Sequence, residues 1–268
     1  IPILDKPMIH YAVEEAVRSG VEEVLFVTAS GKEAIENYFD RNFELEHFLT
    51  NAGKEELCDK VKNIGQMIDV ASVRQKDQLG LGHAIACAES FVGDENFAVI
   101  LGDDLVHSQD PVTSQLIRVS EKNNNSSVIG VMEIPREDTK KYGIVDGSFL
   151  ESDSKSLKMR TMIEKPDPEQ APTNLATPGR YILKSNIFEC LREIPRGKGG
   201  EYQLTDAINL LATKEDVYAH IFEGDRFDTG NVPSYLNAMM EFALRDERYA
   251  RLMRELIQEK AARLNEGK

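Results

Sequence analysis

Two short segments of the chain combine residue types that could bind a nucleotide and a metal ion. Residues 74–84, RQKDQLGLGHA, place two glycines at the predicted start of a helix. Residues 97–101 form an apolar run that predicts a strand, and the carboxylates of Asp103 and Asp104 follow it. Helix N-termini favour anions, glycines let a flat ligand reach the backbone, and open α/β sheets bind ligands beyond the carboxyl ends of their strands. We therefore expect a nucleotide at the helix start and a divalent metal ion at the strand end.

The composition is that of an acidic globular protein. Of the 268 residues, 41% are hydrophobic and 29% are charged, and the net charge is −14. Nucleic-acid binding requires a basic face, so this charge argues against a nucleic-acid partner but not against a nucleotide. The three cysteines, at positions 58, 87 and 190, match neither a zinc site nor a disulfide framework, which predicts a reducing, cytoplasmic location. No apolar run approaches the ~20 residues that span a membrane, so no membrane partner is expected.

The hydrophobic pattern of the first half predicts alternating strands and helices. Strands are expected at residues 23–28, 69–74, 97–101 and 127–134, and helices at residues 5–20, 31–39, 81–91 and 111–122. Asp5 is expected to cap the first helix, with Pro7 in its first turn. Residues 41–66 predict a polar helical insertion, with its anchors expected at Phe43, Leu45, Phe48 and Leu49.

The second half predicts mixed elements with fewer long helices. Strand-like segments lie at residues 142–146, 157–164, 180–183 and 217–223, and helical segments at residues 187–192 and 203–213. Residues 232–265 predict a long charged helix with a break near Asp246. Alternation early and mixed elements later predict an α/β fold with a doubly wound sheet and a smaller attached lobe.

Six short motifs occur in a characteristic order along the chain. They are RQKDQLGLGHA (74–84), LGDD (101–104), YGIVD (142–146), IEKP (163–166), EYQLTDA (201–207) and FDTG (227–230). Together they resemble the bacterial-type UTP–glucose-1-phosphate uridylyltransferases, or UDP-glucose pyrophosphorylases, of the sugar nucleotidyltransferase family. The opening PILDKP (2–7) resembles the end of that family's N-terminal signature. The acidic insertion around YFDRNFELE (38–46) resembles this branch and not the shorter thymidylyltransferases.

The resemblance implies a fold, a reaction and an assembly. The fold would be a Rossmann-like doubly wound mixed sheet of the nucleotidyltransferase type, with a smaller sugar-side lobe and C-terminal helices. Glucose 1-phosphate would attack the α-phosphate of UTP in line, with Mg²⁺, giving UDP-glucose and pyrophosphate. Such chemistry needs no enzyme nucleophile, and it rests on positioning and charge neutralisation. A homodimer or homotetramer is also implied.

The same resemblance implies a division of the chain. Residues 1–231 would form the catalytic domain, with a nucleotide-binding half at about 1–134 and a sugar-binding half at about 135–231. Residues 232–268 would be helices that close the domain or lie in a subunit interface. The family's glycine-rich loop and its lysine are expected upstream of Ile1, so we expect residues to precede this start.

By resemblance, Gln75 reads the base, and the backbones of Gly80 and Gly82 contact the nucleotide. A side-chain amide both donates and accepts, which matches the edge of a uracil ring. From spacing alone, a surface glutamine is the favoured interpretation of Gln75, and an ordinary strand-to-helix turn also explains the glycines. His83 is expected to orient the loop and not to act as a base.

Asp103 is the expected catalytic metal ligand, and Asp228 is the expected second ligand. Mg²⁺ prefers one or two carboxylates together with phosphate and water oxygens. The alternative for Asp228 is the N-cap of the helix that begins near residue 232. Asp104 is expected to be structural, because adjacent side chains on a strand point to opposite sides.

By resemblance, Glu164 binds the glucose hydroxyls and Lys165 binds the sugar phosphate as a second catalytic residue. A carboxylate accepts from neighbouring hydroxyls, and an ammonium neutralises a phosphate as a point charge. Gly143 would bring its backbone close to the sugar. The alternatives are a surface ion pair of small value and an ordinary strand glycine.

Some features stay open at the level of sequence. No chemical role is assigned to Glu201, Asp206 or Arg180. A thymidylyltransferase or another sugar nucleotidyltransferase, and a catalytically silent regulatory protein that binds UDP-glucose, remain as alternatives. An NAD-dependent dehydrogenase is disfavoured, because no G-x-G-x-x-G follows the first visible strand.

Overall fold

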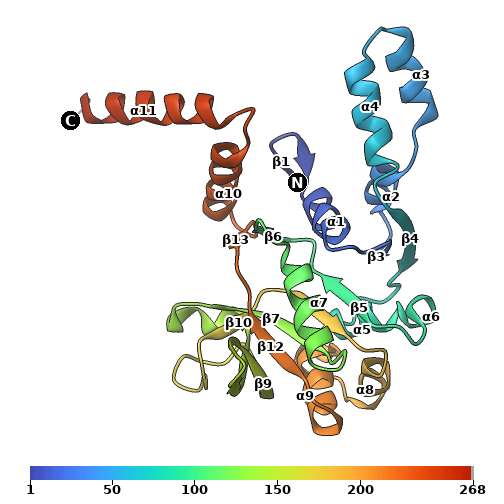
Figure 1. Ribbon diagram of the computed structural model, residues 1–268, viewed down its shortest axis with the longest axis vertical. Helices are drawn as coiled ribbons and strands as arrows, with labels where there is room; N and C mark the ends of the chain where they lie inside the picture. Colours follow the sequence, from blue (N-terminus) through green and yellow to red (C-terminus); the bar gives the residue numbers. More distant parts are fainter. Residues whose placement is uncertain (267–268) are drawn as a thin grey trace. The chain divides into compact units, whose positions relative to one another are not determined.

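The structure, a computed structural model, describes residues 1–266 and divides into two compact units (Figure 1). The smaller unit comprises Ile1–Glu14, Leu101–Gln109 and Gly224–Lys268, and the larger comprises Glu15–Ile100 and Asp110–Glu223. The chain therefore passes from one unit to the other several times, and each unit is built from segments that are distant in sequence.

The larger unit is built on a seven-stranded mixed sheet with the order β10-β8-β9-β12-β7-β11-β5. The strands are β5 (Phe97–Ile100), β7 (Val128–Glu133), β8 (Gly143–Leu150), β9 (Asp153–Glu164), β10 (Leu175–Thr177), β11 (Arg180–Leu183) and β12 (Tyr218–Ile221). Strand β12 runs parallel to β7, and the other pairs described in this sheet are antiparallel. The central strands β7 and β11 are buried on both faces over most of their length, which explains why they are mainly apolar.

Helices pack on this sheet and complete the core of the larger unit. They are α5 (Leu81–Ala86), α6 (Glu89–Val92), α7 (Val112–Lys122), α8 (Ile187–Glu193) and α9 (Leu204–Lys214). A 3-10 helix, η1 (Arg136–Lys141), links β7 to β8, and η2 (Lys198–Gly200) precedes α9. Ile208 and Leu211 of α9 are fully buried among sheet residues such as Ile129 and Leu183, as the amphipathic spacing of α9 predicts.

A second, two-stranded parallel sheet carries the helical insertion. It consists of β3 (Glu23–Thr28) and β4 (Asp69–Arg74), and the predicted bounds of both strands are confirmed. Between them lie α2 (Glu33–Phe39), α3 (Phe43–Asn51) and α4 (Glu55–Ile64). The predicted helical insertion at residues 41–66 is therefore confirmed.

The expected anchors of the insertion are mostly wrong. Phe43 and Phe48 are 70% and 64% exposed, Leu45 is exposed as well, and only Leu49 is buried. Helix α3 packs mainly against the neighbouring α4, so much of its surface stays exposed. The side chain of Asn42 caps α3 by accepting from the Leu45 amide. The apolar spacing shows that a helix forms but not which side of a small helical pair is covered.

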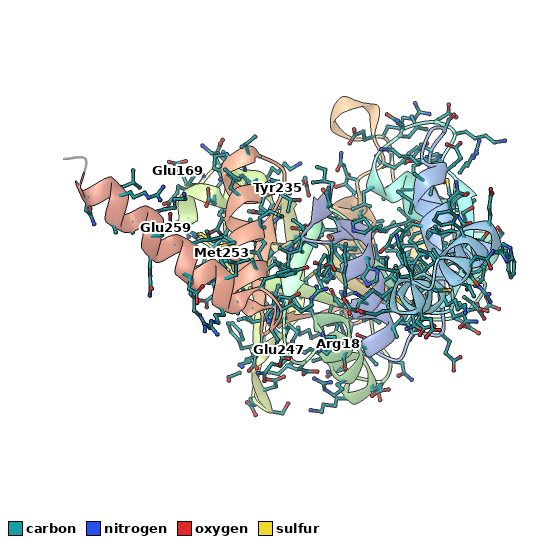
Figure 2. The ribbon with its side chains drawn as sticks, turned by 90° about the horizontal axis from the view of Figure 1, so that it is seen from above. Arg18, Glu169, Tyr235, Glu247, Met253 and Glu259 are labelled. Carbon is teal, nitrogen blue, oxygen red and sulfur yellow. The ribbon has the colours of Figure 1, made fainter. Side chains whose placement is uncertain are left out.

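The smaller unit contains short strands and long helices. These are β1 (Pro2–Ile3), β2 (Lys6–Pro7), β6 (Asp104–His107), β13 (Asp225–Asp228), α10 (Val232–Arg245), α11 (Ala250–Glu266) and the first part of α1 (Met8–Arg18). The predicted break near Asp246 is confirmed. The hydroxyl of Tyr235 on α10, labelled in Figure 2, donates to the Pro2 carbonyl.

The predicted cap of the first helix is wrong. Helix α1 begins at Met8, and Pro7 lies in β2, which pairs with β1. The Asp5 carboxylate forms an ion pair with Arg248 at 2.6 Å and does not accept a capping hydrogen bond from α1. The guanidinium of Arg248 also lowers the pKa of Asp5, since it stabilises the carboxylate form.

Candidate active site

The two predicted metal ligands lie near each other in the smaller unit. Strands β6 and β13 pair antiparallel, and Asp228 lies opposite Asp104 in their register (Figure 1). Asp103 precedes β6 directly, and the Thr229 hydroxyl donates to the Asp103 carbonyl at 3.1 Å. Both strands are short and were absent from the sequence expectations, although LGDD and FDTG cover their ends. The structure thus brings together two segments that are far apart in sequence.

The neighbouring aspartates have different surroundings. Asp104 is buried and forms an ion pair with Arg226 of β13. Within the described residues, neither Asp103 nor Asp228 forms an ion pair with a basic side chain. Asp228 accepts one hydrogen bond, from the Gly230 amide at 2.8 Å. Asp104 therefore occupies a structural position, and the charges of the other two remain available.

The alternative for Asp228 as a helix cap is wrong. The cap of α10 is Asn231, whose side chain accepts from the Ser234 amide at 3.0 Å. No cluster of three or more His, Cys, Asp or Glu side chains suited to a metal occurs among residues 1–266. Mg²⁺ characteristically takes one or two carboxylates and completes its shell with phosphate and water oxygens. The donor set of Asp103 and Asp228 fits that requirement.

The base-loop residues of the larger unit lie in one hydrogen-bonded turn. Gln75 continues the β3–β4 ladder, because its backbone N–H donates to the Thr28 carbonyl. Its side-chain Nε2 donates to the Gly80 carbonyl at 3.1 Å and lies 3.0 Å from Nδ1 of His83. His83 thus fixes the orientation of Gln75, the orienting position expected for it.

The two glycines of this turn are required by a close neighbour. Gly80 has a φ of +90°, and a Cβ there would lie 2.7 Å from Cβ of Glu201. A Cβ on Gly82 would lie 2.6 Å from the Tyr202 carbonyl oxygen. Both distances are shorter than real Cβ contacts, so only glycine fits at these two positions. The backbone of the loop therefore lies directly against residues 201–202.

The sugar-side residues meet at the ends of β8 and β9. Gly143 and Glu164 are direct partners in the antiparallel register. A Cβ on Gly143 would lie 3.3 Å from Oε2 of Glu164 and 3.1 Å from Cγ2 of Thr177. The missing side chain therefore leaves room beside the carboxylate.

Lys165 follows in an unusual backbone conformation. Its φ is +48°, which is strained for a residue with a Cβ. Its amide donates to the Tyr142 carbonyl at 3.0 Å, and Nζ lies 3.5 Å from Oε1 of Glu164. Lys165 is 60% exposed, so its ammonium can reach a ligand.

Thr205 is a candidate site residue that sequence reasoning missed. Its hydroxyl donates to Oε2 of Glu164 at 2.7 Å, although 41 residues separate the two. The available signal was the EYQLTDA motif, to which no role was assigned. Thr177, the neighbour of Gly143, has a buried hydroxyl that finds no hydrogen-bond partner among residues 1–266.

Arg180 has a structural position. It is 1% exposed, and its guanidinium forms an ion pair with Glu15 of α1 at 3.0 Å. The same Glu15 carboxylate accepts from both the amide and the hydroxyl of Thr113. This buried charge is paired and hydrogen-bonded, which is the arrangement that a protein interior tolerates.

The cysteines take no part in this site. Burial raises the pKa of Cys87 and of Cys190, because desolvation disfavours the thiolate. A protonated thiol is a poor nucleophile. All three cysteines are free.

The larger unit combines a mixed α/β sheet with a glycine turn and a carboxylate–lysine pair, features that suit an enzyme that transfers nucleotides. The family described as "Nucleotidyl transferase" matches residues 1–244, and the chain belongs to it. Enzymes of this family generally use a divalent metal. The predicted family and the predicted mixed α/β fold are confirmed.

Particular relatives are similar over most of their length. A UTP–glucose-1-phosphate uridylyltransferase of Staphylococcus epidermidis is 44% identical over 259 residues, covering 97% of this chain and 89% of the relative. That of Bacillus subtilis is 45% identical over 247 residues, covering 92% of this chain and 84% of the relative.

Solved structures give the same grouping. The UTP-bound UDP-glucose pyrophosphorylase of Acinetobacter baumannii has a TM-score of 0.89 at 38% identity, covering 97% of this chain and 90% of that chain. A UDP-glucose pyrophosphorylase complexed with UDP-glucose has a TM-score of 0.82 at 39% identity, covering 92% and 90%. A Bacillus anthracis glucose-1-phosphate thymidylyltransferase shares the fold, with a TM-score of 0.68 at 17% identity.

Proposed function

We propose that the protein is a uridylyltransferase that makes UDP-glucose and pyrophosphate from UTP and glucose 1-phosphate. The observation that carries this proposal is the grouping of the predicted sugar residues Gly143, Glu164 and Lys165 at one end of a strand pair. The identity of 44–47% to uridylyltransferases over most of the chain supports it.

For the nucleotide, we propose that Gln75 binds the uracil edge and that the backbones of Gly80 and Gly82 line the base. The Gln75 amide is already oriented by His83, so binding needs little rearrangement. Nε2 of Gln75 donates to the Gly80 carbonyl and lies against Nδ1 of His83, so Oε1 is the atom that can accept from the uracil N–H.

For the sugar phosphate, Glu164 holds glucose hydroxyls and Lys165 holds the phosphate. The Thr205 hydroxyl occupies Oε2 of Glu164, which leaves Oε1 as the oxygen for the sugar. Lys165 aligns the phosphate for in-line attack on the α-phosphate of UTP, and that alignment is the main source of the rate.

For the cofactor, we propose Mg²⁺ held by Asp103 and Asp228. When bound, the ion would supply the positive charge that neutralises phosphate oxygens. The two aspartates contribute negative charge that no protein cation in the described residues has already neutralised. Mg²⁺ dependence is thus the expected property of the reaction.

Neither alternative gains support from an observation. The thymidylyltransferase likeness, at 17% identity, concerns the fold alone. Nothing in the described residues favours a silent UDP-glucose-binding protein over an enzyme.

Three further predictions from the sequence are retained. They are the domain boundary at residue 231, a homodimer or homotetramer, and a cytoplasmic location, which is consistent with the free cysteines. Among the helices of residues 1–266, none combines the length and apolar character needed to cross a membrane.

Pyrophosphate release from UTP is the deciding experiment. It is measured with and without glucose 1-phosphate, with and without Mg²⁺, and with dTTP in place of UTP. Release that requires glucose 1-phosphate and Mg²⁺ and prefers UTP supports the proposal. Preference for dTTP would favour a thymidylyltransferase, and tight UDP-glucose binding without release would favour a regulatory protein.

A further inference from the structure

Residues 201–209, which we call the connecting segment, contact both halves of the proposed substrate site. They run from Glu201 into the first turns of α9 (Figure 1). One end touches the glycine turn of the base loop, and the other touches Glu164. All these contacts lie within the larger unit. The segment includes the EYQLTDA motif, so these contacts assign a structural role to that motif.

At the base-loop end, the contact is made by backbone. The Tyr202 amide donates to the Leu79 carbonyl at 2.7 Å, and the Gly82 amide donates to the Tyr202 carbonyl at 2.9 Å. Two hydrogen bonds on one residue fix both the distance and the direction of the loop. Because Gly80 and Gly82 leave no space for a Cβ here, the loop cannot move closer to the segment.

The Tyr202 side chain reaches the base-reading residue through one intermediate. Its ring stacks on His83, with centroids 6.3 Å apart and planes inclined by 26°. Nδ1 of His83 in turn lies 3.0 Å from Nε2 of Gln75. The guanidinium of Arg196 lies 5.5 Å from the centre of the same tyrosine ring. Tyr202 therefore sets the position of Gln75 without approaching the base itself.

At the sugar end, the contacts are made by side chains. Thr205 donates to Oε2 of Glu164 at 2.7 Å. Asn209, one helical turn later, accepts from the Met162 amide and donates to the Met162 carbonyl, both at 2.8 Å. Met162 lies on the same strand, just before Glu164. The segment therefore forms hydrogen bonds with the end of β9 at two residues, Met162 and Glu164.

The two ends are close and stiffly joined. Tyr202 lies two residues before the start of α9, and Thr205 lies in the first turn of that helix. Leu204 and Thr205 are buried, and Leu204 belongs to the main core. A shift at one end therefore has little room to be absorbed before the other end. A misplacement of about 1 Å at reacting groups can reduce rates about 100-fold.

We propose that the connecting segment couples the base loop to the sugar-binding carboxylate, with Tyr202 and Thr205 as positioning residues. This inference rests on the proposed function of Gln75 and Glu164. Binding of UTP to the loop steadies Tyr202, and Tyr202 steadies Thr205 and the Glu164 carboxylate. By linkage, glucose 1-phosphate raises the affinity for UTP by the same factor.

The test compares paired variants at each end. Tyr202→Ala removes the stacked ring and Tyr202→Phe keeps it. Thr205→Val removes the hydroxyl and Thr205→Ser keeps it. Lys214→Gln, on the exposed last turn of α9, is the control for changes to the helix that touch neither end. Thermal unfolding and circular dichroism establish that each variant is folded.

We expect both Tyr202→Ala and Thr205→Val to raise KM for both substrates by about fivefold or more, the effect of losing one contact in a network. Tyr202→Phe, Thr205→Ser and Lys214→Gln should stay within about twofold of wild type. In the double variant, the two effects should fall short of multiplying, because the first substitution has already released the segment.

The contrary result is equally clear. If Tyr202→Ala raises KM for UTP alone, Thr205→Val raises KM for glucose 1-phosphate alone, and the effects multiply, the two ends act independently. Calorimetric titration of the same variants with UTP, with and without glucose 1-phosphate, measures the coupling as binding. A wild type that binds cooperatively but releases no pyrophosphate would overturn the proposed reaction and leave the coupling intact.

Discussion

The substrate residues of the larger unit and the aspartates of the smaller unit are prepared for binding in opposite ways. Gln75 and Glu164 are already engaged, by His83 and Thr205 respectively. Asp103 and Asp228 carry charges that no cation in the described residues neutralises. A base or a hydroxyl is neutral and is recognised by direction, so its partners must be fixed beforehand. A cation is recognised by charge, so the carboxylates that bind it must not already be paired with a basic side chain.

The contrast between the two units is tested most strongly by removing the charge of the Asp103 carboxylate. Asp103→Asn should lower turnover about 100-fold or more, since it takes a charge from the proposed metal site. The melting temperature should change little, because the Asp103 carboxylate forms no ion pair with any residue that the structure describes. Steady-state rates across a Mg²⁺ titration and a thermal melt provide both measurements. Normal Mg²⁺-dependent turnover would place the metal elsewhere.

Lys165→Ala tests the sugar side of the comparison. The loss of a phosphate-binding ammonium should raise KM for glucose 1-phosphate by about 10- to 100-fold, and much more than KM for UTP. Lys165→Arg keeps the charge and serves as the matched variant. A larger effect on UTP would assign the lysine to the nucleotide.

Asp104→Asn sharpens the contrast between the adjacent aspartates. It removes the negative charge of one partner from a buried ion pair with Arg226. We expect a loss of stability on the order of 2–4 kcal/mol, with Mg²⁺ dependence unchanged. Denaturant unfolding of this variant beside Asp103→Asn measures it. The assignment of the two aspartates is wrong if Asp104→Asn abolishes Mg²⁺ dependence and Asp103→Asn lowers only the stability.

His220 offers the smallest effect, on stability alone. Burial lowers the pKa of His220 despite the nearby Asp153 carboxylate, and the charges of Lys155 and Arg118 lower it further, while Glu223 opposes them. The ring also lies 2.8 Å from the Ser156 hydroxyl on β9.

The sign of the pH dependence follows from this lowered pKa. The unfolded chain binds a proton near the ordinary value of 6.5 that the folded chain resists, so stability is complete above 6.5 and declines as the pH falls below it. His220→Gln should lose less stability between pH 8 and pH 5 than wild type. Paired melts at both pH values isolate the contribution, because the other titrating groups are shared. Equal losses would show that the folded and unfolded chains bind the His220 proton equally well.

The sequence predicts what is local and regular. Strands β3 and β4 have the predicted bounds because apolar runs flanked by turn residues specify them. The short strands β6 and β13 are missed, since four residues stabilised only by each other carry no periodic signal. Thr205 is missed for a related reason: its partner is 41 residues away, and no pattern within α9 identifies it.

The site residues follow the same division. Gly143 and Glu164 can be anticipated from motifs, but their direct pairing depends on the register of β8 and β9. The exposure of Phe43 and Phe48 could not be anticipated, because spacing defines a helical face without saying what covers it.

The ion pair between Glu15 and Arg180 has a consequence for synthesis. Its members are 165 residues apart, so Glu15 leaves the ribosome long before its partner exists. At ordinary translation speeds this interval is roughly 10 to 30 seconds. Until it ends, the Glu15 carboxylate lacks the guanidinium of Arg180, and α1 cannot complete its place in the larger unit. Helix α1 is therefore among the last elements to reach its final packing, although it is synthesised before them.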